Sequence, residues 1–122
     1  MSEQELPPWL REQLARYEQM QQNLQAVMIQ KQQVDMELAE TDKALEELKK
    51  AVDSEQIYKY AGNLLVKVSK EAMLKDLTEK KELAATRTLV LQKQEARFRE
   101  SLKDIQTKID QSMKQKTAAN PE

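Results

Sequence analysis

The chain contains neither cysteine nor histidine, and it has one glycine, three prolines and 4% aromatic residues among its 122 residues. Without these two residue types there is no disulfide, no Ser-His-Asp triad, no Cys-His pair and no zinc site of thiolate or imidazole ligands. A single glycine is also too few for a Gly-rich phosphate loop or for the many turns of a β-sandwich. Carboxylates are abundant, but no pattern places them in a pocket. We therefore expect neither an enzyme nor a bound metal or cofactor.

Charge and hydropathy exclude two further classes of partner. The chain has twenty Lys and Arg residues and twenty-one Asp and Glu residues, which gives a formal net charge of −1. The chain as a whole therefore lacks the strong excess of basic residues that is typical of nucleic-acid-binding proteins. No segment approaches the roughly 18–20 apolar residues of a membrane span, and the acidic segment 1–5 is unlike a signal peptide. We expect a cytoplasmic protein that binds neither nucleic acid nor membrane. With only 39% hydrophobic residues, a compact monomeric core would be weak, so an elongated or multi-subunit protein is indicated.

Apolar residues recur with a heptad period in both halves of the chain, which predicts two long coiled-coil helices over residues 9–52 and 70–116. The first series is apolar except at Gln13, Lys31 and Thr41: Leu6, Leu10, Gln13, Tyr17, Met20, Leu24, Val27, Lys31, Val34, Leu38, Thr41, Leu45, Leu48 and Val52. The second is weaker in its middle: Leu74, Leu77, Lys81, Ala84, Thr88, Leu91, Glu95, Phe98, Leu102, Ile105, Ile109 and Ser112. Ser69 is the expected N-cap of the second helix.

Residues 56–68, between the two helical segments, have β character and include the only glycine. Gly62-Asn63 is a two-residue hairpin signal with Gly in the first central position. Pairing across this turn matches Ala61 with Leu64, and continues outward to Ile57 with Val68. Both faces of this hairpin are then apolar: Ile57, Ala61, Leu64, Val66 and Val68 lie on one, and Tyr58, Tyr60 and Leu65 on the other.

A lone two-stranded hairpin with two apolar faces and two unpaired edges is marginal in water. We expect hairpins of several subunits to join in a common sheet or barrel. The alternative is a hairpin that folds onto its own helices, which would cover one face only. The expected fold is thus all-α dominated: a long antiparallel two-helix coiled coil with one central β-hairpin that joins an inter-subunit β-barrel, in a single domain over 1–122 with both termini at the end of the coil distal to the hairpin.

This arrangement resembles the β-type prefoldin subunit in its archaeal form. The hairpin motif carries the likeness, with Tyr58-Lys59 before the turn and Gly62-Asn63-Leu64-Leu65-Val66 at and after it. The segments Leu14-Ala15-Arg16-Tyr17-Glu18-Gln19-Met20-Gln21-Gln22-Asn23-Leu24 and Glu40-Thr41-Asp42-Lys43-Ala44-Leu45-Glu46-Glu47-Leu48 also look like that family. One hairpin, as here, is typical of the β type, whereas the α type has two.

The resemblance implies an ATP-independent holdase without cofactor or catalytic residues. In that family two α and four β subunits join through their hairpins, and the coiled-coil tips bind unfolded protein clients and pass them to a group II chaperonin. The assembly residues implied for this chain are Ile57, Tyr58, Tyr60, Gly62, Asn63, Leu64, Leu65, Val66 and Val68.

The tip residues expected to bind clients are Trp9, Leu10, Leu14, Tyr17, Ile105, Ile109 and Met113. A holdase needs exposed apolar surface that is flanked by charge, and Trp9, Leu14 and Met113 lie off the seam. The seam residues among the seven have an alternative role, which is to close the end of the coiled coil. Met28 and Ile29 either extend the client surface or pack on the partner helix. A structural or tethering coiled coil without chaperone activity is the alternative function.

Overall fold

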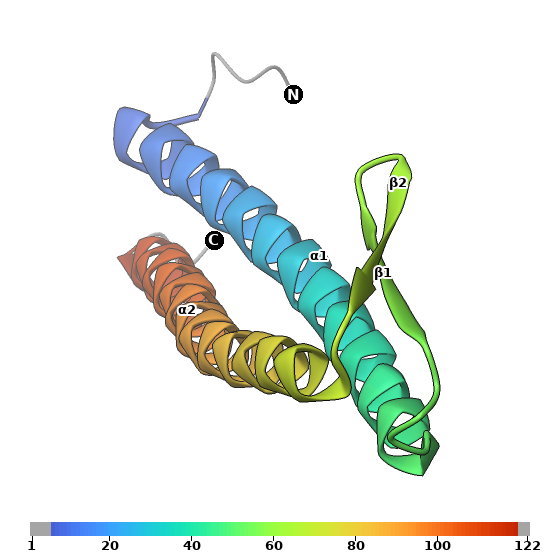
Figure 1. Ribbon diagram of the computed structural model, residues 1–122. Helices are drawn as coiled ribbons and strands as arrows, with labels where there is room; N and C mark the ends of the chain where they lie inside the picture. The colour runs from blue at the N-terminus through green and yellow to red at the C-terminus, as the bar shows by residue number, and fades with distance from the viewer. Residues whose placement is uncertain (1–5, 120–122) are drawn as a thin grey trace. The chain divides into compact units, whose positions relative to one another are not determined.

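The structure is a computed structural model that describes residues 6–119, with side chains described to residue 115. The chain forms helix α1 (Pro8–Lys50), strands β1 (Ile57–Ala61) and β2 (Leu64–Val68), and helix α2 (Lys70–Ala119), as Figure 1 shows. The two helices contain 43 and 50 residues. Two long helices with a central antiparallel hairpin confirm the predicted fold class. The chain ends, predicted to lie at the tip of the coil, fall at 1–5 and 120–122, outside the described residues.

Helix α1 begins one residue earlier and ends two residues earlier than the sequence indicated. Pro8 is the first helical residue, where its missing N–H costs nothing, and the Pro7 carbonyl accepts hydrogen bonds from the amides of Leu10 and Arg11. At the other end the Ala51 amide bonds to the Leu48 carbonyl, which tightens the last turn. A turn over residues 52–55 follows, so Val52 leaves the helix.

Helix α2 begins as its sequence predicted. The Ser69 hydroxyl accepts a hydrogen bond of 3.0 Å from the amide of Ala72, which confirms Ser69 as the N-cap. Glu71 lies in the first turn, where a carboxylate faces the positive end of the helix dipole. Lys70 Nζ donates to the Ala51 carbonyl at 2.8 Å, so the first residue of α2 also satisfies a backbone acceptor beyond the end of α1.

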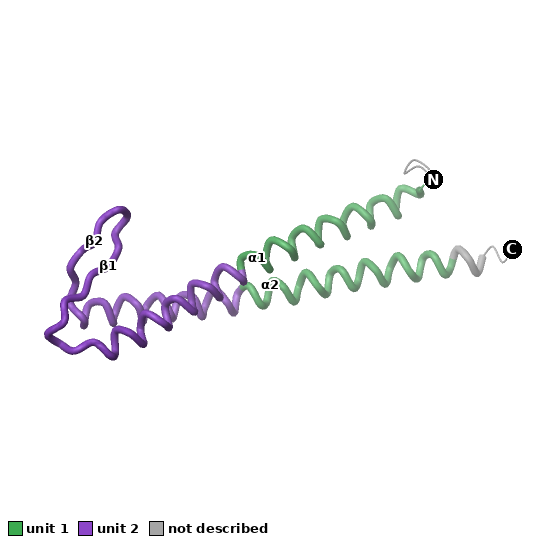
Figure 2. Tube along the Cα trace, turned by 90° about the vertical axis from the view of Figure 1, so that its right-hand side faces the viewer, with its two compact units in different colours: residues 1–30, 91–122 green, residues 31–90 purple. Residues whose placement is uncertain are grey.

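The chain divides into two compact units, which Figure 2 colours separately. The end unit comprises 1–30 and 91–122, of which 6–30 and 91–119 are described. The hairpin unit comprises residues 31–90 and includes both strands. In each unit a segment of α1 and a segment of α2 lie side by side (Figure 2), and the short connection through the hairpin makes the two segments antiparallel.

Burial follows the predicted heptad series closely. Val34 has no exposed surface, and every buried residue of the described chain belongs to one of the two series: Leu10, Val27, Val34, Thr41, Leu45, Leu48, Leu77, Ala84, Leu91 and Ile105. Two positions depart from the pattern. Val52, expected as the last seam residue of the first series, is 56% exposed because the helix has already ended at Lys50. Lys81 is exposed, since its charged end extends toward water and Asp42.

The hairpin has the register that the sequence predicted. Ile57 pairs with Val68, Tyr58 with Lys67, Lys59 with Val66, Tyr60 with Leu65 and Ala61 with Leu64. Gly62 has φ of +63°, whereas Asn63 does not have a positive φ. This is the pattern of a turn that needs glycine at its first central position only, and it matches the right-handed twist of the strands.

Candidate functional site

One end of the hairpin packs on the helices. Ile57 lies against an apolar cluster formed by Leu45 and Leu48 of α1 and Leu77 of α2, together with Ala44, Met73 and Leu74. The next residue on the same face, Lys59, forms an ion pair of 3.5 Å with Asp76 of α2. The face that carries Ile57 is therefore covered by the chain's own helices only near its start.

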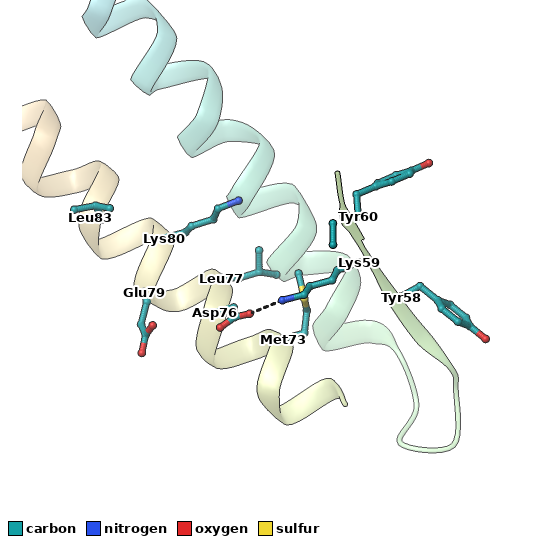
Figure 3. A pocket seen from close by; sticks show the side chains of 10 residues that line it. Tyr58, Lys59, Tyr60, Met73, Asp76, Leu77, Glu79, Lys80 and Leu83 are labelled. Carbon is teal, nitrogen blue, oxygen red and sulfur yellow. Dashed lines mark hydrogen bonds and ion pairs between the residues drawn. The ribbon is translucent and has the colours of Figure 1, made fainter. Parts of the chain in front are cut away.

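The remaining apolar surface of the hairpin is open. Tyr60 is 81% exposed and Leu64 68%. The other exposed apolar residues of the two strands are Tyr58, Ala61, Leu65 and Val66, and within residues 6–119 the sheet contains only β1 and β2. Tyr58 and Tyr60 point away from α2 in Figure 3. Two free strand edges and several exposed apolar side chains on a sheet of ten residues form a surface that is unfavourable in water.

A groove lies between the hairpin and α2 (Figure 3), and no pattern in the sequence predicted it. Its hairpin wall consists of residues 58–61, all from β1, and its helical wall is formed by Met73, Asp76, Leu77, Glu79, Lys80 and Leu83. Leu83 is 62% exposed and lies off the heptad seam, which is the one signal in the sequence that pointed to this face. The hairpin's contacts with Met73, Asp76 and Leu77, near the start of α2, are tertiary features that local patterns do not encode.

In the end unit the off-seam apolar residues are exposed. Trp9 is 38% exposed, Leu14 43% and Met113 48%. The seam residues differ from them, because Leu10 and Ile105 are buried and Tyr17 and Ile109 are half-buried. The structure thus separates the seven predicted tip residues into three that present apolar surface to solvent and four that pack in the seam.

Two apolar residues of α1 extend the exposed surface of the end unit. Met28 and Ile29 are both about half exposed, and Arg99 Nη2 lies 3.7 Å from Met28 Sδ. Arg99 therefore places a positive charge beside this apolar patch. Charged residues next to exposed apolar residues reduce the tendency of such a surface to aggregate. The hairpin unit has exposed apolar residues of its own on the helices: Met36, Leu83, Leu89 and Val90.

The described residues offer no group of three or more Asp or Glu side chains arranged to hold a metal ion. Neither helix, as far as it is described, has a segment apolar enough to cross a bilayer.

The fold defines a class: proteins with one β-hairpin between two long coiled-coil helices. A model of the family described as "Prefoldin subunit" matches residues 11–116. The chain belongs to the prefoldin family, as a chaperone subunit of the β type. This membership implies assembly with other prefoldin subunits.

Curated relatives and a solved structure support the assignment. The chain is 47% identical over 105 residues to prefoldin subunit beta of Archaeoglobus fulgidus, covering 86% of this chain and 90% of that one. It is 41% identical over 115 residues to prefoldin subunit beta of Pyrococcus furiosus, covering 94% and 98%. The crystal structure of the prefoldin beta subunit from Thermococcus strain KS-1 superposes with a TM-score of 0.80 at 38% identity, covering 89% of this chain and 96% of that one.

Proposed function

We propose that the chain is the β subunit of an ATP-independent holdase, which binds non-native polypeptides at the tips of its coiled coils and delivers them to a group II chaperonin in the cytoplasm. In the assembly we infer two prefoldin α subunits and four copies of this chain, joined through their hairpins in a β-barrel. Trp9, Leu14 and Met113 are the proposed client contacts.

One observation carries this proposal: the end unit keeps three large apolar side chains exposed although its seam buries neighbouring apolar residues. Trp9 and Leu14 come from the start of α1, and Met113 from the last described turns of α2. Each such side chain contributes on the order of 1–3 kcal/mol when a client covers it. Methionine adapts its shape to varied partners, which suits a surface that must accept many sequences.

The test is suppression of the aggregation of a denatured model protein by assembled complexes. The variant carries Trp9→Ser, Leu14→Ser and Met113→Ser in every copy of this chain. We expect an intact assembly with clearly weaker protection, because loss of the same contacts from several tips is amplified by multivalent binding.

A matched control carries Met36→Ser, Leu89→Ser and Val90→Ser, which remove three apolar side chains of 50–59% exposure from the hairpin unit. Protection by this control should equal that of the wild type. Unchanged protection by the tip variant would exclude the proposed contacts, and a loss with Met28→Ser and Ile29→Ser instead would place client binding on that pair.

A structural or tethering coiled coil is the alternative function. It predicts that complexes of wild-type chains leave the aggregation of the denatured protein unchanged. It also predicts a dimer of helices without a β-barrel, which sedimentation velocity distinguishes from a hexamer.

A further inference from the structure

Met28 of α1 and Arg99 of α2 contact each other in the end unit, with 3.7 Å between Met28 Sδ and Arg99 Nη2. We propose that Met28 is a modification site: a hydroperoxide oxidises its thioether to the sulfoxide, and Arg99 binds the new oxygen. The modified side chain then joins the two helices more strongly than the unmodified one. This inference concerns the end unit alone and does not rest on the proposed function.

The guanidinium of Arg99 is oriented by a second group. Arg99 Nε donates to Glu95 Oε2 at 3.0 Å, one turn earlier on the same helix. Because an arginine carries five N–H donors in a planar fork, a bond from Nε leaves Nη2 able to donate toward Met28. A thioether sulfur is only a weak acceptor. The contact therefore pairs a strong cationic donor with a poor acceptor.

Oxidation changes that acceptor. Met28 is 47% exposed, so a small peroxide in solution can approach its side chain. A lone pair of the sulfur attacks one oxygen of the peroxide, and the S–O bond forms as the O–O bond breaks. The proton of the attacked oxygen passes to the departing oxygen, which leaves as water or an alcohol. The sulfur has then given a pair of electrons to the peroxide, and the product is methionine sulfoxide.

The new oxygen has a partner within reach. A hydrogen bond from a cationic donor is shorter and stronger than one between neutral groups, so Arg99 Nη2 binds a sulfoxide oxygen better than it binds the thioether. Oxidation of a methionine that packs among apolar residues instead disrupts the packing. Met20 and Met73 are half-buried, and Met73 packs against an apolar cluster. Met28 differs from them because its sulfur faces a guanidinium.

Two full-length chains, each with one oxidisable methionine among the described residues, test the site. Both carry Met20→Leu, Met73→Leu and Met113→Leu. The first adds Met36→Leu and keeps Met28, whereas the second adds Met28→Leu and keeps Met36, which also lies on α1 and is 59% exposed. After treatment with hydrogen peroxide, peptide mass mapping locates the added oxygen, and urea unfolding at fixed protein concentration gives the midpoint.

We expect oxidation to raise the midpoint of the Met28 chain by about 0.5 M, because a hydrogen bond to a charged group adds stability. The midpoint of the Met36 chain should stay unchanged or fall. Methionine sulfoxide reductases should return the Met28 chain to its starting midpoint. A Met28 chain whose midpoint does not rise, or one that gains no oxygen on Met28 at a peroxide concentration that oxidises Met36, would overturn the proposal.

Arg99→Ala in the Met28 chain identifies the partner of the sulfoxide. Oxidation of this variant should leave the midpoint unchanged or lower it, because the donor of the new hydrogen bond is missing. Arg97→Ala is the matched control, since Arg97 is another exposed arginine of α2, and the rise should persist in that variant. A rise that survives Arg99→Ala would contradict the assignment of Arg99.

The wild-type chain and Met28→Leu keep the test valid if the combined leucine substitutions reduce helical circular dichroism. The other methionines are the same in these two proteins. After the same oxidation the midpoint of Met28→Leu should therefore fall further, relative to its unoxidised form, than that of the wild type. An equal change in the two proteins would also contradict the proposal.

Discussion

Lys81 Nζ of α2 lies 2.9 Å from Asp42 Oδ1 of α1, so a heptad position of one helix is occupied by a cation that reaches a carboxylate on the other. A second ion pair, between Arg87 and Glu37 at 3.3 Å, joins the same two helices in the hairpin unit. All four side chains are about half exposed, and pairs of this kind each contribute only about 0.2–1 kcal/mol. Their position suits a role in fixing the register of the helices more than in raising stability.

Lys81→Leu should therefore raise stability. The leucine extends the apolar seam beside Leu77 and Ala84, whereas the ion pair that it removes contributes at most about 1 kcal/mol. We expect a higher urea midpoint by circular dichroism, measured at fixed protein concentration because the chain associates. Asp42→Asn, which removes the ion pair alone, should lower the midpoint slightly. A lower midpoint for Lys81→Leu would show that the pair is worth more than its exposure indicates.

Thr41→Val tests a polar residue within the seam. Thr41 is buried, and its hydroxyl donates to the Glu37 carbonyl of the preceding turn at 2.8 Å. Such a bond to a carbonyl in the same helix adds little, and valine has nearly the same size, so we expect stabilisation of about 0.5–1 kcal/mol. Thr86 makes the same contact with the Glu82 carbonyl at 3.1 Å but is exposed, so Thr86→Val should be neutral. Equal effects of the two changes would contradict the argument.

Val34→Ala should destabilise the coiled coil clearly, because Val34 is the described side chain with no exposed surface. Removing its two methyl groups leaves a cavity, and we expect destabilisation of about 2 kcal/mol in urea unfolding. Met36 lies two residues away and is 59% exposed, so Met36→Ala should stay within about 0.5 kcal/mol. Similar losses for both variants would mean that α1 contacts another chain at Met36.

The heptad series predicted which side chains are buried because the helical period is a local property of the sequence. Turn chemistry at Gly62-Asn63 likewise determined the register of the hairpin. Neither pattern predicts where the hairpin lies on the helices, since that depends on the contact of Ile57 with Leu45, Leu48 and Leu77 and on the Lys59–Asp76 pair. For the same reason the groove beside β1 could not be derived from sequence, although off-seam Leu83 was visible there.

Ser69→Ala should weaken the start of α2. It removes the acceptor for the Ala72 amide, at a cost of about 1 kcal/mol, while Ser69→Asp keeps an acceptor and should retain stability. Ser54→Ala, in the turn on the other side of the hairpin, serves as the exposed control. Thermal unfolding at fixed concentration measures all three, and a loss for Ser69→Asp equal to that for Ser69→Ala would exclude capping as the cause.

The same serine is also the only residue that joins the hairpin to α2. Strand β2 ends at Val68 and α2 begins at Lys70, so one residue joins them, whereas six residues separate α1 from β1. The Lys59–Asp76 ion pair adds a second link between the hairpin and α2, and the hydrogen bond from Lys70 to the Ala51 carbonyl joins the start of α2 to the residue that follows α1. The covalent path from the hairpin to α2 is therefore shorter than the path to α1, and the contact of Ile57 with Leu45 and Leu48 is what couples the hairpin to α1. A pulling force on the hairpin backbone would reach α2 through one linking residue and α1 through six.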